Sequence, residues 1–103
     1  MSKVKSVILS FLASDSPDVV GYKLYYVLEG TGVNYDSPFV SLDNNTDVDL
    51  GGFVELMGLD GVYDIGIVAV DDAGNESDMS MVANVPLDFI APSAPGEVVI
   101  TRL

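Results

Sequence analysis

The most regular part of the chain is residues 63–70, which read Tyr63-Asp64-Ile65-Gly66-Ile67-Val68-Ala69-Val70. Tyr63, Ile65 and Ile67 occupy every second position, and this spacing is typical of a β-strand with one face in the core. The turn-forming residues Asp71-Asp72-Ala73-Gly74-Asn75 follow directly. We therefore expect a strand that ends at a tight turn, and this pair of signals sets the class of the fold.

The rest of the chain repeats this alternation of short apolar runs and turns. Apolar residues predominate in each run, Asp, Asn, Ser and Gly predominate between the runs, and no stretch shows a convincing helical period. We expect an all-β fold, a two-sheet antiparallel sandwich, rather than alternating strands and helices. The other expected strands are 7–13, 22–26, 38–42, 48–56 with a bulge or bend at Gly51-Gly52, and 79–85.

Composition excludes several classes of function. The 103 residues suffice for one core, and 16 acidic against four basic residues give a formal charge of -12. Such a charge repels phosphate backbones and anionic lipid surfaces, so we expect neither nucleic acid nor a membrane as partner. Cysteine and histidine are both absent, which removes disulfides, the usual zinc sites and every imidazole base.

The N-terminal segment has some features of a secretory signal. Lys3 and Lys5 precede the apolar run 7–13, which ends in a small residue, Ala13. The run is at the short limit for a signal and too short to cross a bilayer. We interpret it as a strand, and expect neither a signal peptide nor membrane insertion.

From Val7 to Val85 the order of these signals resembles that of a fibronectin type III domain, an immunoglobulin-like β-sandwich. Residues 7–11 resemble its second strand, with Phe11 where tryptophan is usual, and residues 16–26 resemble the start of its third. Residues 59–63 resemble the tyrosine corner of the family, which implies a tying role for the hydroxyl of Tyr63. Residues 65–77 resemble the sixth strand and its loop, although the spacing at the corner is shorter than usual.

One strand of the family pattern is displaced. Only six residues precede the run at 7–13, so the first strand of the family is missing there, whereas residues 91–101 resemble its proline-rich lead and first strand. We divide the chain into a sandwich at 1–86, a proline-containing linker at 87–96 and a C-terminal strand at 97–103.

This displacement suggests how the protein could function. Without a first strand, the run 7–13 would form an edge with unpaired backbone groups, which folds normally protect. We hypothesise that the C-terminal strand completes the sandwich of a neighbouring copy, head to tail. Folding back onto its own body, or a truncated or disordered tail, are the alternatives. Pairing of residues 6–13 by another segment while the tail stays free in solvent would contradict donation. The acceptor residues would be Val7, Ile8, Leu9 and Phe11, and the donor residues Val98, Val99, Ile100, Thr101 and Leu103.

The acidic loops offer weak candidates for metal binding. Asp43, Asn45, Asp47 and Asp49 resemble the start of a calcium loop, because hard cations prefer oxygen ligands at alternating positions. Val48 stands in place of the required glycine, and the twelfth position is Val54 instead of Glu. We interpret the segment as a solvated loop, with weakly bound calcium as the alternative and no cofactor otherwise.

Other chemistry has little support. Glycoside hydrolysis needs two carboxylates across a cleft, whereas nearly all the acids here lie in expected turns. Tyr25 falls on the strand face opposite Tyr22 and Tyr26, so we expect it to be exposed and available to a sugar or a protein.

We therefore expect a non-enzymatic structural subunit that associates with itself in a filament, a surface layer or a virus particle. The alternative is a monomeric accessory module of a secreted or surface protein that binds carbohydrate or another protein. Either hypothesis favours the cell exterior or a virus particle as the location.

Overall fold

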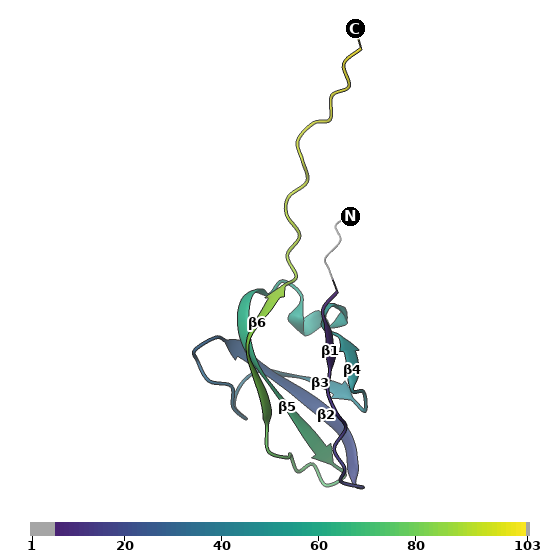
Figure 1. Cartoon of the computed structure of the whole chain (residues 1–103), viewed down its shortest axis with the longest axis vertical. Coiled ribbons are helices and arrows are strands. Elements are labelled where there is room, and N and C mark those ends of the chain that lie inside the picture. Colours follow the sequence, from purple (N-terminus) through teal and green to yellow (C-terminus); the bar gives the residue numbers. More distant parts are fainter. Residues whose placement is uncertain (1–5, 103) are drawn as a thin grey trace.

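The computed structural model describes residues 6–102 and forms an antiparallel β-sandwich (Figure 1). The smaller sheet pairs β1 with β4, and the larger has the strand order β3-β2-β5-β6. This arrangement confirms the expected all-β class. None of the helices among residues 6–102 has the length and apolar character needed to cross a membrane. The strands are β1 (Ile8–Ser10), β2 (Val19–Leu28), β3 (Phe39–Asp43), β4 (Asp47–Asp49), β5 (Asp60–Asp71) and β6 (Ser80–Asp88).

The alternation in β2 and β5 explains the centre of the larger sheet. Leu24 lies opposite Ile67, and Tyr26 lies opposite Ile65, so their apolar side chains share the inner face. This face packs against the smaller sheet, and the core between the two includes Leu24, Leu42 and Leu50, each at most 1% exposed. The expected strands at 22–26, 38–42, 63–70 and 79–85 are all confirmed, most with longer bounds.

The expected strand at 48–56 is wrong beyond Asp49. The chain instead forms two 3-10 turns, η1 (Leu50–Gly52) and η2 (Val54–Leu56). The carboxylate of Asp49 accepts a hydrogen bond of 2.9 Å from the backbone N–H of Gly51, which stabilises the first turn. Because Leu50 and Leu56 both enter the core, the two turns bury the apolar residues that were expected to alternate along a strand.

The sandwich also extends further along the chain than expected. The linker was placed from residue 87, but β6 continues to Asp88, and Leu87 and Phe89 are 0% and 7% exposed. Pro86 lies within β6, which proline tolerates because β6 is an edge strand here and one side of its backbone has no ladder to complete. The backbone N–H of Phe89 donates to the carbonyl of Leu59 at 2.8 Å, so the sandwich ends only after this residue.

Candidate functional site

The backbone of β1 is paired along one edge only. β4 occupies that edge, where the carbonyl of Val7 accepts from Leu50 N–H at 2.8 Å and Phe11 N–H donates to the carbonyl of Thr46 at 3.0 Å. Alternate residues of an antiparallel strand direct their backbone groups to opposite edges. The groups of Ile8 and Ser10 therefore point away from β4, to an edge that no other strand occupies within residues 6–102.

The side chains of β1 and its flanks divide in the same way. Val7, Leu9 and Phe11 are partly buried and pack against the core, with the Phe11 ring edge-on to Tyr22 at 4.9 Å between centroids. Ile8 is 63% exposed. The four expected acceptor residues thus lie together on β1 or next to it, three facing the core and one facing outward.

Across the sandwich, β6 is uncovered where it lies opposite this open edge. Val82 is paired with Ile65, so both side chains lie on the inner face of the larger sheet. Ile65 is 2% exposed, but Val82 is 57% exposed. An inward-facing valine with this exposure marks a place where the sandwich lacks a covering strand.

A groove of about 500 Å³ runs between β1 and β6. Its walls come from both sheets and are mostly apolar, with Ser14, Ser77 and Asp78 among its polar residues. The arrangement offers an apolar trough beside a row of unpaired backbone groups, which are the two features that an added β-strand requires. The apolar lining residues are Leu9, Phe11, Leu12, Tyr22, Ile67, Ala69, Met81 and Val82.

The C-terminal segment extends away from the body (Figure 1). Beyond Phe89 it forms no strand within the described residues, and it makes the molecule 71 Å long against 27 and 19 Å across. Val98, Val99 and Ile100 are between 74% and 84% exposed, and Thr101 is exposed as well. Residues 97–102, the described part of the expected strand at 97–103, form no strand in the single chain and do not fold back onto its own body. Leu103 lies outside the described residues.

The acceptor residues and the described donor residues, 98–101, are thus not in contact within one chain. β4 pairs with β1 and the tail is free, so the observation stated above as contradicting donation is met as it was worded. That condition was too broad, because β4 occupies only one edge of β1, and an added strand would use the other edge, which no strand occupies within residues 6–102. The structure brings the residues of β1 and β6 together in one groove. The apolar segment 98–100 lies apart from it and packs against nothing within residues 6–102.

Tyr25 is not the exposed contact that was expected. It does lie on the face opposite Tyr22 and Tyr26, but only 2% of it is exposed. The rings of Tyr35 and Phe39 pack against it at 5.9 and 5.4 Å, and its hydroxyl donates to the carboxylate of Glu76. Burial, reinforced by this hydrogen bond, raises the pKa of Tyr25 to about 12. Alternation predicted the face correctly, but not that residues 29–38 would cover it.

The calcium candidates are engaged in local hydrogen bonds. The Asp47 carboxylate accepts from the Ser10 hydroxyl, the Asp49 carboxylate caps η1, and the Asn45 amide donates to the carbonyl of Leu42 at 3.0 Å. The Asp43 carboxylate accepts from the Ser41 hydroxyl at 3.5 Å. Among the residues that the structure describes, no three acidic side chains lie close enough to hold a metal ion together.

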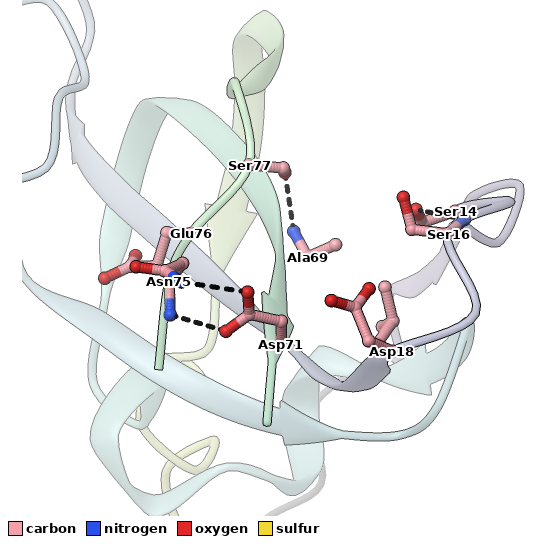
Figure 2. Close-up of a pocket in the computed structure, with 9 residues that line it drawn as sticks. Ser14, Ser16, Asp18, Ala69, Asp71, Asn75, Glu76 and Ser77 are labelled. Atoms are coloured by element: carbon pink, nitrogen blue, oxygen red, sulfur yellow. Dashed lines mark hydrogen bonds between the residues drawn. The ribbon is translucent and has the colours of Figure 1, made fainter. Parts of the chain in front are cut away.

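A small polar pocket of about 240 Å³ lies at the end of the sandwich where β5 finishes (Figure 2). Asp71 dominates its structure, because its carboxylate accepts from the backbone N–H of Ala73 and from both the N–H and the side-chain amide of Asn75. The hydrogen bonds from Asn75 lower the pKa of Asp71. The carboxylate is thus occupied in shaping the turn that follows β5.

The tyrosine that ties a loop differs from the one expected. Across residues 6–102 the hydroxyl of Tyr63 has no hydrogen-bond partner, whereas that of Tyr22 accepts from the backbone N–H of Ser14 at 3.0 Å.

Sequence reasoning also missed Met81 and Val82 as groove residues. Their apolar character within β6 was visible, but their exposure depends on which strand is absent.

Comparison with known proteins adds no relative to this picture: no protein-family model, no curated protein and no solved structure matches the chain.

Proposed function

We propose that this protein is a non-enzymatic structural subunit that associates with itself by donating its C-terminal strand to the sandwich of the next copy. One observation carries the proposal. The open edge of β1 borders an apolar groove, while the apolar segment Val98–Ile100 of the same chain extends into solvent. A filament, a surface layer or a virus particle is the setting that such a subunit fits.

The two surfaces are complementary in chemistry. Met81 and Val82, which line the groove, are each more than half exposed, and the tail exposes three consecutive β-branched residues. Burying such side chains removes apolar surface from water at about 25 cal/mol per Å², and added main-chain pairs satisfy the free edge. β-Branched residues also favour the extended conformation that the groove would accept.

The two surfaces match in length as well. The stretch from Val7 to Leu12 spans about 17 Å, and the stretch from Val98 to Leu103 spans the same distance when extended. A fibronectin type III-like sandwich that lacks its first strand accounts for both the open edge of β1 and the uncovered position of Val82. The displaced strand at the C-terminus would supply what each copy lacks.

The proposal is tested by the molar mass of the full chain across a concentration series, measured by light scattering. We expect the mass to rise above the 10.9 kDa of one chain as concentration increases. The double variant Val98→Ser/Ile100→Ser should stay at the monomer mass, because losing two buried side chains weakens association by about 3 kcal/mol or more.

A matched control makes the same kind of change elsewhere. Val54 and Met57, beside or within η2, are 78% and 64% exposed and lie outside the groove, so Val54→Ser/Met57→Ser should assemble like the unmodified chain. A full chain that stays monomeric at millimolar concentration would sink the proposal, as would a tail variant that assembles normally.

The alternative, a monomeric module that binds a sugar or a protein, loses its best single contact but keeps two half-exposed rings, Tyr35 and Phe39. Its best candidate, Tyr25, is buried beneath Tyr35 and Phe39.

A further inference from the structure

We infer that the donated strand runs antiparallel to β1 and joins copies in one direction only, so that the assembly is an open, polar filament. This inference rests on the proposed strand donation and specifies its geometry. It follows from where the tail leaves the sandwich and where the groove opens.

The tail leaves at the end of the sandwich where β1 begins, here called the tail pole. Phe89, at the root of the tail, packs beside Gly51, and the neighbouring Leu50 is hydrogen-bonded to Val7. β1 runs from this pole toward the opposite end, where β5 finishes (Figure 1). This end is here called the loop pole, and Ser14, Asp18 and Asp71 line a pocket there. The tail continues outward from the tail pole, roughly along the long axis of the molecule.

These positions fix the direction in which a second copy can receive the strand. If the next copy is stacked in the same orientation, the tail meets its loop pole first. The groove includes Ser14 and Ser77, which also line the pocket at that pole, so it reaches the end from which the tail arrives. The strand would then run toward the tail pole of the acceptor, opposite in direction to β1. Antiparallel pairing is also the slightly more stable of the two.

The length of the linker excludes this geometry within one chain. Fully extended, residues 91–96 span at most about 20 Å, and the distance along β1 from Val7 to Leu12 is about 17 Å. To place Glu97 beside its own Leu12, the linker would have to run the whole length of β1 and then turn, and residues 91–96 are too short for both. Pro92 and Pro95 stiffen the linker further. A tail that folds back could therefore pair with its own β1 only in the parallel direction.

The same geometry determines how copies are related. Donor strand and acceptor groove lie along one axis at opposite poles, so the interface joins two different surfaces. Repeating such an interface without rotational closure adds copies in a line, each with a free groove at one end and a free tail at the other.

Engineered disulfides test the direction, because the chain contains no cysteine of its own. Four double variants form a matched set: Leu12→Cys/Glu97→Cys and Ile8→Cys/Thr101→Cys for the antiparallel direction, and Ile8→Cys/Glu97→Cys and Leu12→Cys/Thr101→Cys for the parallel one. All four positions are exposed in the single chain. Disulfides form only when the two Cα atoms come within about 7 Å, which separates the two sets.

Mild oxidation at assembling concentration, followed by a non-reducing gel, gives the readout. We expect the antiparallel pairs to form ladders beyond the dimer, at least tenfold faster than the parallel pairs. Faster linkage of the parallel pairs, or antiparallel linkage that stops at a dimer, would overturn this inference but leave strand donation standing. Intramolecular linkage alone, or no linkage in any variant, would overturn the proposed function as well.

Discussion

The two faces of the four-stranded sheet are closed by different means. On the outer face, residues 29–38 cross over Tyr25, and the hydroxyl of Tyr35 donates to the carbonyl of Ser77 at 2.6 Å. On the inner face, the smaller sheet covers Leu24 completely but leaves Val82 more than half exposed. The chain thus covers one face with its own loop and leaves one flank of the other exposed to solvent.

The largest change in unfolding free energy should come from a substitution in the covered part of the inner face, compared with one in the uncovered part. Leu24→Ala should cost about 2 to 5 kcal/mol of unfolding free energy, because it leaves a cavity in a filled core. Val82→Ala should cost less than about 1 kcal/mol in the monomer, because its side chain still contacts water. Urea denaturation at low protein concentration measures both. Equal losses would show that the groove is filled in solution.

A second change would close the open flank deliberately. We would remove residues 1–5 and 91–103 and place residues 97–103 before Ser6, joined by a two-residue Asn-Gly turn that favours hairpins. The relocated strand would run antiparallel to β1 within one chain. We expect a monomer whose melting temperature is higher than that of the same chain without the graft by about 4 °C or more.

The control for this graft replaces the residues at Val98 and Ile100 with serine in the relocated strand. Its melting temperature should fall back to that of the ungrafted chain. A graft that aggregates, or one that melts no higher than its serine control, would contradict the idea that this strand fits the groove.

Tyr25→Phe tests how the outer face is sealed. The variant loses the hydrogen bond to Glu76, so we expect it to lose about 1 kcal/mol at neutral pH. The folded-state pKa of Tyr25, about 12, lies above its ordinary value of 10.0, so folding favours the neutral phenol. The stabilisation is present in full below pH 10 and disappears as the pH rises through about 12. Denaturation of both proteins from pH 8 to 12 should show their difference shrinking, and a constant difference would contradict this role.

The smallest effect should come from salt. Stacked copies would bring the acids of the loop pole, such as Asp71, toward those of the tail pole, such as Asp88. Lys23 is the only basic residue between Ser6 and Gly96, so few positive charges offset this repulsion. Raising ionic strength screens this repulsion. We expect assembly to strengthen about threefold between 20 and 300 mM NaCl in sedimentation experiments. Weakening by salt would indicate that attraction between charges, and not apolar strand insertion, holds the copies together.

Local patterns predicted most of the fold because they report local physics. The alternation at Tyr63, Ile65 and Ile67 requires one buried face wherever the strand lies. The same logic failed at residues 50–56, where a carboxylate cap at Asp49 and the pull of the core on Leu50 and Leu56 favoured 3-10 turns. It failed at Pro86 because the penalty for proline in a strand depends on whether the strand is an edge, which is a tertiary property.

The candidate site was predictable in part. Val7, Ile8, Leu9 and Phe11 were identified as acceptor residues on an unprotected strand, and the apolar character of Val98 to Ile100 was visible in the sequence. The opposite wall, Met81 and Val82, was not, because residues far apart in the chain form one groove only after the sheets are stacked. The burial of Tyr25 was missed for the same reason.

By itself, the sequence determined that this protein is an acidic, all-β sandwich with an apolar C-terminal segment. Those properties depend on side-chain periodicity and charge, which need no knowledge of neighbours. Only the tertiary structure decided which edge of β1 stays open, which residues face it across the sandwich, and at which pole the tail departs. These are relations between distant segments, and they are set by how the two sheets pack and where each strand ends.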